Sequence, residues 1–314
     1  MALTSGQFRN YMDNCGAELT EINEDLDKNS YYRQFMDVGS ATRQVERDNT
    51  IENMSAVTRF QEGSARGELD FNEGYPQSYM QAQWGGMVEI TKVIKKFEML
   101  GLLARLNGQL VRAMAKSKEV IGASFLEYGD VAIASVPLVG GEPIIKSIGG
   151  DGTELFGTAH TFKSGGPTWS NKSASLLDLT ETAIDTTYKD IMRWQDNTGA
   201  PLDVQMVGLI FPPEFRAKAH KVLNSLKEPA TSNNAENAAR VQIRNQTLEL
   251  KWLSSTTDWY VQTDATTGGL QWLEGWGDEI DTHAVHPRTG NECVTADYSA
   301  AYGANSLHSL YKVT

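Results

Sequence analysis

The stretch KVIKKFEMLGLLARLNGQLVRAMAKSKEVIGASFLE, residues 92–127, decides the fold. Its apolar residues recur at spacings of three, four or seven, which predicts one buried face of a single long helix. At 1.5 Å per residue this helix would be about 50 Å long, more than a small domain needs to close its own core. The apolar positions are Val93, Phe97, Leu100, Leu103, Leu106, Leu110, Met114, Ile121 and Phe125.

The other face of the predicted helix is basic, with Glu98 as its one acid. We interpret it as a solvated face, or as one that meets acidic neighbours such as residues 258–297. Contact with enclosed nucleic acid is the alternative, although no aromatic residues for base stacking alternate with the basic ones. The basic positions are Lys92, Lys95, Lys96, Arg105, Arg112, Lys116 and Lys118.

On the N-terminal side of the helix, two segments have too few residues around them to form a buried core of their own. Residues 1–50 are polar and acidic, and we expect short helical turns at most in an arm that lies on something else. Residues 55–91 predict a long hairpin, with a strand from Val57 to Gln61 and a turn between Gly63 and Gly67. Such a hairpin needs a partner for its exposed edges.

On the C-terminal side, predicted strands and helices alternate, which is typical of a small mixed α/β domain. VAIASVPLV (131–139) predicts a short strand, residues 175–196 a helix, DVQMVGLIF (203–211) a buried strand, and PPEFRAKAHKVLNSL (212–226) a helix opened by proline. Residues 227–245 predict an exposed loop. Strands return after residue 246, through to CVTADYSAAYGA (293–304).

Composition excludes several classes of protein. The 314 residues are 40% hydrophobic, as in a globular chain, and 28 Lys and Arg against 40 Asp and Glu give a net charge of −12. An acidic chain is a poor general binder of nucleic acid or anionic membrane. We expect no signal peptide and no membrane span. Cys15 and Cys293 are expected to be free thiols.

Two groups of residues could form a metal site or a catalytic site. His283 and His286 lie near Asp281 and Cys293, but their spacing fits no standard metal site, and we expect a solvated loop and no metal. The second combines tryptophans with acids, as a carbohydrate-active enzyme would, but strand-borne tryptophans more often fill a core. Its members are Trp252, Trp259, Trp272, Trp276, Glu274, Asp278, Glu279 and Asp281.

The order of elements, together with three phrases, resembles the major capsid protein of tailed bacteriophages. DGTELFGTAHTF (151–162) is similar to the phrase after the spine helix of Mu-like head subunits. TGAPLDVQMVGLIFPPEFRAKAHKVLNS (198–225) is similar to a capsid strand that ends in Pro-Pro before a helix, and ADYSAAYGANSLHSLYK (296–312) fits the closing strand. The resemblance spans nearly the whole chain.

This resemblance implies the Hong Kong ninety-seven fold, an α+β architecture with an N-terminal arm, an extended hairpin loop, a long spine helix, a peripheral domain and a mixed α/β axial domain. The implied segments are 1–50 for the arm, 51–91 for the extension loop, 92–160 for the peripheral domain with its spine helix, 161–285 for the axial domain, and 286–314 for strands that return to the peripheral domain.

The implied function is a non-enzymatic shell subunit without cofactor. It would assemble in the host cytoplasm, as pentamers and hexamers, into an icosahedral head around double-stranded DNA, with a portal protein at one vertex. The basic helix face would then face the lumen. The alternatives are an encapsulin-type nanocompartment shell, a carbohydrate-active enzyme, and another phage structural part such as a tail or portal subunit. Contact with a neighbouring subunit is expected at the loop tip: Gly63, Ser64, Ala65, Arg66 and Gly67.

Two departures from the family shape the expected partners. Some members crosslink a lysine of the extension loop to a neighbouring asparagine, but no lysine occurs here between Lys28 and Lys92. Other members carry a long helical scaffolding segment at the N-terminus, for which residues 1–50 are too short and too weakly patterned. We therefore expect a separate scaffolding protein or none, and reinforcement by non-covalent overlap or a cement protein.

Overall fold

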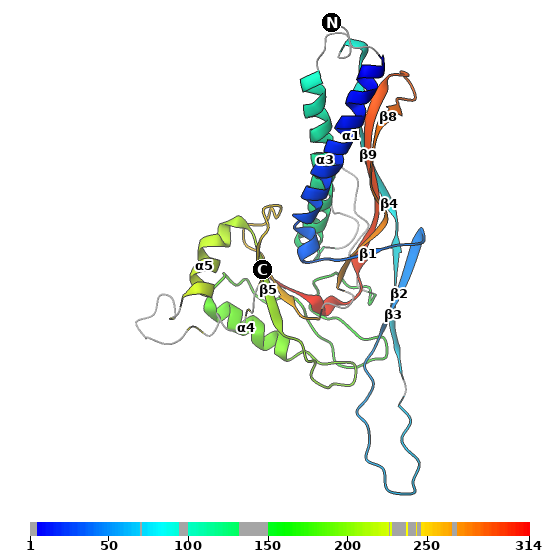
Figure 1. Cartoon of the computed structure of the whole chain (residues 1–314). Helices are drawn as coiled ribbons and strands as arrows, with labels where there is room; N and C mark the ends of the chain where they lie inside the picture. Colours follow the sequence, from blue (N-terminus) through cyan, green and yellow to red (C-terminus); the bar gives the residue numbers. More distant parts are fainter. Residues whose placement is uncertain are drawn as a thin grey trace.

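The computed structural model describes residues 5–69, 71–93, 100–131, 150–225, 227, 237, 243, 246–265 and 269–314. The chain forms an upper lobe and a lower lobe, and a long hairpin projects beyond both (Figure 1). Three sheets organise the described residues, with strand orders β1-β8-β9-β4, β10-β7-β5-β6 and β2-β3. The first belongs to the upper lobe, the second to the lower lobe and the third to the hairpin (Figure 1).

The upper lobe packs two helices against its sheet. The sheet contains β1 (Asp37–Ser40), β8 (Leu270–Val285), β9 (Glu292–Ala304) and β4 (Ala82–Ile90), and α3 (Leu100–Glu127) lies along it (Figure 1). The predicted long helix is confirmed over 100–127, with its apolar face buried through Leu103, Met114 and Ile121. Residues 94–99, with Phe97, lie outside the described part of the chain.

The N-terminal segment corrects the expectation of short turns in a loose arm. Ser5–Lys28 forms α1, a 24-residue helix that lies beside α3 (Figure 1). Phe8, Met12 and Leu19 enter a buried cluster together with Leu103 of α3. Their spacing of four and seven is helical, but it is embedded in an acidic, polar sequence. The few apolar residues suffice because α3 and the sheet supply the rest of the core.

The lower lobe has the predicted mixed α/β character. Its sheet runs from β10 (Leu310–Val313) through β7 (Trp259–Thr263) and β5 (Met206–Phe211) to β6 (Gln246–Glu249). The buried strand predicted at 203–211 is therefore confirmed as β5.

Two helices accompany this sheet (Figure 1). In α4 (Glu181–Met192), the Thr180 side chain accepts a hydrogen bond from Ala183 N at 3.2 Å. The proline-opened helix is confirmed as the short turn η4 (Pro213–Phe215), which runs into α5 (Arg216–Asn224).

Strand pairing divides the C-terminal region differently from the predicted boundaries. β8, placed in the axial segment, pairs with β9 in the upper sheet, whereas β10 leaves that sheet and pairs with β7. The short turn η5 (Leu307–Ser309) joins the two lobes at this point. The strand expected at 131–139 lies outside the described residues beyond Val131, as does most of the loop at 227–245.

The hairpin differs from the prediction in where its strands lie. β2 (Val45–Ile51) pairs antiparallel with β3 (Glu73–Met80), and the described residues between them form no strand. The predicted strand from Val57 to Gln61 is therefore wrong. Its alternation of apolar and polar residues needs a covered face, and Val57 is 83% exposed.

Candidate assembly surface

The extension loop, here residues 52–72, extends beyond the two lobes (Figure 1). All five tip residues predicted to contact a neighbour are exposed. Ser64 donates from its hydroxyl to the carbonyl of Gln61 at 2.7 Å, and Gly63 adopts a φ of 85° that favours glycine. The Arg66 guanidinium lies 5.5 Å from the centre of the Phe60 ring. The tip thus makes its own turn.

The extension loop also carries large apolar side chains that are open to solvent. Phe60 is 50% exposed and Phe71 is 55% exposed, and Met54, Val57 and Leu69 are exposed as well. Monomeric proteins rarely display so many apolar side chains on one narrow projection, and such clusters mark interaction sites. This loop is the strongest candidate for a surface completed by another chain.

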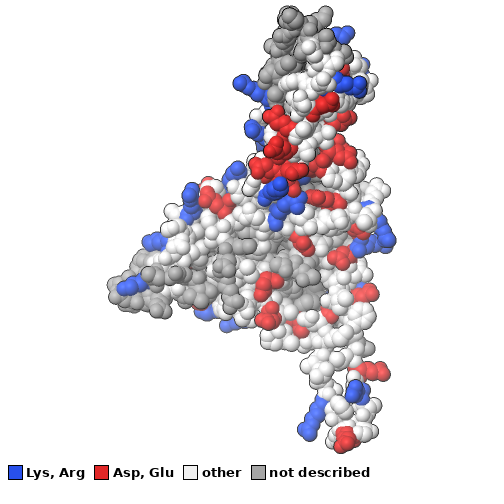
Figure 2. Space-filling view, viewed as in Figure 1, with Lys and Arg blue, Asp and Glu red and all other residues white. Residues whose placement is uncertain are grey.

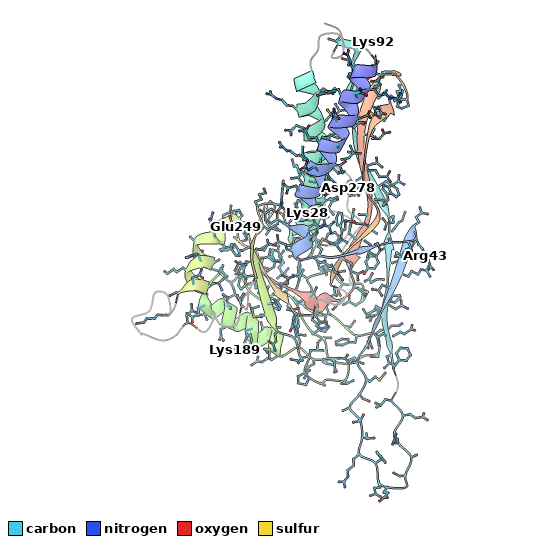
Figure 3. All side chains as sticks on the ribbon, in the orientation of Figure 1. Lys28, Arg43, Lys92, Lys189, Glu249 and Asp278 are labelled. Carbon is cyan, nitrogen blue, oxygen red and sulfur yellow. The ribbon has the colours of Figure 1, made fainter. Side chains whose placement is uncertain are left out.

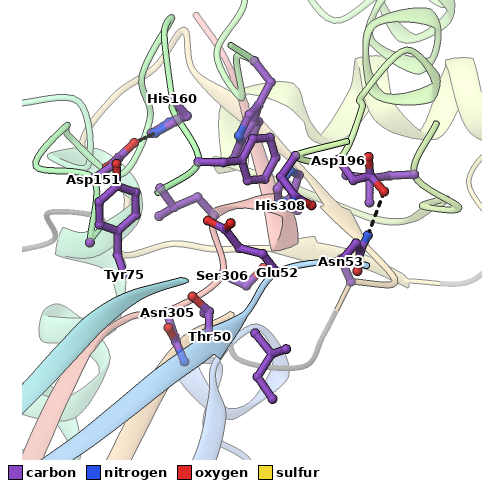
Figure 4. Close-up of a pocket in the computed structure, with 18 of the residues that line it drawn as sticks. Thr50, Glu52, Asn53, Tyr75, Asp151, His160, Asp196, Asn305, Ser306 and His308 are labelled. Carbon is purple, nitrogen blue, oxygen red and sulfur yellow. Dashed lines mark hydrogen bonds and ion pairs between the residues drawn. The ribbon is translucent and has the colours of Figure 1, made fainter. Parts of the chain in front are cut away.

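The root of the extension loop is anchored firmly to the lower lobe. Glu52 is 9% exposed, and its carboxylate accepts hydrogen bonds from the backbone amides of Lys163, at 2.7 Å, and Ser164, at 3.2 Å. Asn53 donates from Nδ2 to Asp196 Oδ2 at 3.3 Å (Figure 4). The root is therefore positioned before any neighbour arrives.

A pocket of about 670 Å³ lies beside this root (Figure 4). At its wall, His160 Nδ1 lies 2.8 Å from Asp151 Oδ2, and His160 Nε2 lies 3.0 Å from Asn171 Oδ1. Burial would raise the pKa of Asp151, but hydrogen bonds from His160 and Thr153 hold it below its ordinary value. His160 is thus the centre of a polar network.

That network has a structural role, because Asn171 also ties distant segments together. Its Nδ2 donates to the carbonyls of Leu155, at 2.7 Å, and Leu307, at 3.0 Å. The phrase DGTELFGTAHTF therefore supplies the joint between the lower lobe and the C-terminal strands. The sequence pattern did not predict a role for Asn171, which joins this phrase to Leu307, a residue 136 positions away along the chain.

The two chemical constellations do not form sites. His283 Nε2 lies 2.7 Å from Asp13 Oδ1, while His286 Nδ1 accepts from the backbone amide of Thr289 at 3.1 Å. Among the described residues, no three His, Cys, Asp or Glu side chains gather so that they could hold a metal ion. Cys15 and Cys293 are buried free thiols.

In the tryptophan-rich acidic region, two of the four tryptophans belong to the core, Trp252 packs against it partly buried, and Trp276 is 37% exposed. Trp259 and Trp272 are fully buried. Glu274 Oε1 lies 2.9 Å from the Arg33 guanidinium, and Asp278 Oδ1 lies 2.6 Å from Lys118 Nζ. Both carboxylates are thus occupied by cations of the same chain, which does not support a glycoside-cleaving pair.

The match to a family model now decides the class of protein. The model described as phage capsid protein matches residues 74–292, more than half of the chain. This chain belongs to the phage capsid protein family. It is a capsid shell subunit of the virion and not an enzyme. No curated protein matches it in sequence.

Solved structures agree in fold with this family. The capsid of cyanophage P-SCSP1u matches with a TM-score of 0.54 at 10% identity, over 90% of this chain and 87% of that chain. A Mycobacterium phage Patience structure matches at 0.52 and 11% identity, over 99% and 89%. The bacteriophage JBD30 capsid matches at 0.52 and 13% identity, over 71% and 90%. The resemblance to tailed-phage capsids is confirmed.

Only some of the residues predicted for the basic face of the capsid protein are exposed together on α3. Arg105, Arg112 and Lys116 are exposed on α3. Lys92 is exposed at the far end of the upper lobe, away from Lys28 and Asp278 (Figure 3). Lys95 and Lys96 lie outside the described residues.

Lys118 is a correction to that face, because it is 5% exposed and points inward. Lys118 lies two residues beyond Lys116, about 200° around the helix, so the two side chains point to opposite sides of α3. The Lys118 ammonium group contacts Asp278 and lies 5.0 Å from the centre of the Tyr298 ring. Asp278 also accepts from Asn23 Nδ2 at 2.8 Å, so the pair links α1, α3 and β8.

A second buried cation of the capsid protein was also missed. Lys312 of β10 is 2% exposed, and its Nζ lies 3.0 Å from Asp130 Oδ1 and 3.2 Å from Asp258 Oδ2. These ion pairs join residues far apart in the sequence. No local sequence pattern predicts these ion pairs.

No helix in the described ranges is both long enough and apolar enough to cross a membrane.

Proposed function

We propose that this capsid protein completes its fold on neighbouring copies through the extension loop, and so builds the pentamers and hexamers of an icosahedral head around double-stranded DNA. The observation that carries the proposal is the contrast between an anchored root at Glu52 and exposed apolar side chains at Val57 and Phe60. Burying one such side chain on a neighbour contributes about 1.5–3 kcal/mol. A closed shell repeats that gain at every contact.

The segments have corresponding proposed roles. The extension loop, residues 52–72 of the expected segment 51–91, reaches a neighbouring subunit, whereas β4 stays in the upper sheet of its own subunit. α3 is the spine of the peripheral domain, and the lower lobe faces the symmetry axes. The arm would be tied down by α1 rather than loose, because α1 packs on α3. A separate scaffolding protein, a cement protein, and a portal at one vertex are the proposed partners, with assembly in the host cytoplasm.

The net charge of −12 supports weak, non-specific contact with the enclosed DNA. A shell that held its genome tightly would need a strongly basic lumen. A genome co-purifying with native shells is the expected result. An enzyme cargo in its place would point to a nanocompartment.

Deleting residues 60–70 tests the extension-loop role. The subunit should stay folded, because residues 60–69 are exposed and lie outside both cores, but shells should fail to form. Light scattering, negative-stain imaging and thermal unfolding measure these effects. As a control, Leu176→Ser and Val285→Ser change apolar side chains that are 78% and 62% exposed outside the loop, and should not affect assembly. Normal shells from the deletion would contradict the proposal.

A further inference from the structure

The exposed bases of α3 form a regular stripe. We call Arg105, Arg112 and Lys116 the basic stripe. The spacings of seven and four place them along one side of the helix, over about 16 Å. None of the three makes an ion pair with another residue in the described part of the chain. The stripe is thus an uncompensated row of positive charge.

The outer side of α1 carries the opposite charge. We call Glu18, Glu21 and Asp25 the acidic stripe; all three are exposed. None of them makes an ion pair within the described ranges, in contrast to neighbouring Glu24, which lies 3.6 Å from Lys28. Glu18 and Asp25 are seven residues apart, a rise of about 10 Å that matches Arg105 to Arg112.

The two stripes do not neutralise each other within one copy, although α1 and α3 are neighbours. The helices meet through Met12, Leu19 and Leu103, so their charged residues point outward. In Figure 2, acidic side chains gather over the front of the upper lobe and basic ones stand along its α3 edge. Opposite charge on two faces of one molecule, together with the matching seven-residue separations of Glu18–Asp25 and Arg105–Arg112, suits a head-to-tail contact between copies.

We propose that the basic stripe of one capsid subunit docks on the acidic stripe of a second copy, as an ion-paired contact between helices of neighbouring subunits. This inference rests on the proposed assembly function. It assigns a protein partner to the basic stripe, so the stripe would not face DNA. Because exposed charges are screened by salt, the contact should weaken at high ionic strength.

Charge reversal with reciprocal rescue tests the contact on the full chain. Each reversal alone should lower the assembled fraction about tenfold at low salt, because like charges then oppose each other. Combining both reversals in one chain should restore assembly to near the wild-type level, because the pairs reform with exchanged signs. The variants are R105E/R112E/K116E for the α3 reversal and E18K/E21K/D25K for the α1 reversal.

Circular dichroism of each variant confirms folding. If the α3 reversal unfolds the chain, the neutral variant R105Q/R112Q/K116Q replaces it. This variant should assemble less well than wild type, and its assembly should depend less on salt concentration. Failure of the double reversal to rescue would overturn the inference. So would normal shells from the α3 reversal that retain less DNA, since the stripe would then face the genome. Wild-type chains that never oligomerise would instead overturn the proposed function.

Discussion

The extension loop and β9 have similar local patterns of apolar and polar residues, but only β9 forms a strand. Both alternate larger apolar residues with small or polar ones, which is typical of strands. β9 lies between β8 and β4 and buries Val294, Tyr298 and most of its length. The described residues of the extension loop pair with no neighbouring strand, and Val57 is 83% exposed. A strand is therefore made by its partners as much as by its own residues.

The comparison extends to energetics. In the body, most apolar side chains already contact others, so their burial stabilises the single subunit. In the extension loop, the same kind of side chain contributes nothing until a second chain covers it. Substitutions in the body should therefore change unfolding, whereas substitutions in the loop should change assembly.

Leu103→Asp should give the largest effect on the unassembled subunit. Leu103 of α3 is fully buried in a cluster with residues of α1. A charge at this position should lower the free energy of unfolding by about 4 kcal/mol or more. Gln109→Asp on the exposed side of α3 is the control, with an expected change within about 0.5 kcal/mol. Chemical denaturation measures both. A soluble Leu103→Asp variant of normal stability would mean that a different face of α3 is buried.

Lys118→Met should have the next largest effect. It leaves the Asp278 carboxylate buried without its cation, which should cost about 3 kcal/mol. The exposed neighbour Lys116→Met is the matched control, with an expected change within about 0.5 kcal/mol. Equal stabilities of the two variants would show that the Lys118–Asp278 pair contributes no more to the free energy of unfolding than an exposed lysine does.

Local patterns predicted much of the body of this fold. The apolar spacing of residues 100–127, the proline before α5 and the apolar run of β5 each point to one structure. Sequence order then indicated the family, and the family model agrees. These features depend on neighbours along the chain, which a single sequence displays.

What could not be predicted depends on contacts between distant residues. α1 looked too polar to fold because its partners Leu103 and Val294 lie elsewhere in the chain. Lys118 looked like its exposed neighbours because nothing local shows Asp278 beside it. The reverse error occurred at residues 57–61, where a good strand pattern has no partner in the same chain.

His308 should give an effect on stability that depends on pH and is absent near neutral pH. Its ring stacks on Trp169 with centroids 3.6 Å apart, and burial, together with nearby His160, lowers its pKa to about 3. The unfolded chain binds a proton here near pH 6.5 and the folded chain does not. Stability should therefore be complete above pH 6.5 and fall by up to about 1.4 kcal/mol per unit as the pH decreases toward 3.

His308→Phe should remove this one-proton contribution while keeping a ring against Trp169. Its stability should fall less steeply than that of wild type between pH 6 and pH 4. The exposed His220→Phe on α5 should keep the wild-type slope. Denaturation midpoints across that pH range measure the difference, and identical slopes for His308→Phe and wild type would show that His308 is protonated in the folded chain.

Phe60→Asp should have the smallest effect on the subunit and is the sharpest test of the comparison. It makes the same kind of change as Leu103→Asp, but on a ring that is 50% exposed in the extension loop. Because no core is disturbed, the unfolding free energy should stay within about 0.5 kcal/mol of wild type. Assembly should nevertheless decrease, because the charge must be desolvated when a neighbouring subunit covers the loop. If Phe60→Asp destabilises the isolated subunit while its assembly is normal, the loop belongs to the body and the comparison fails.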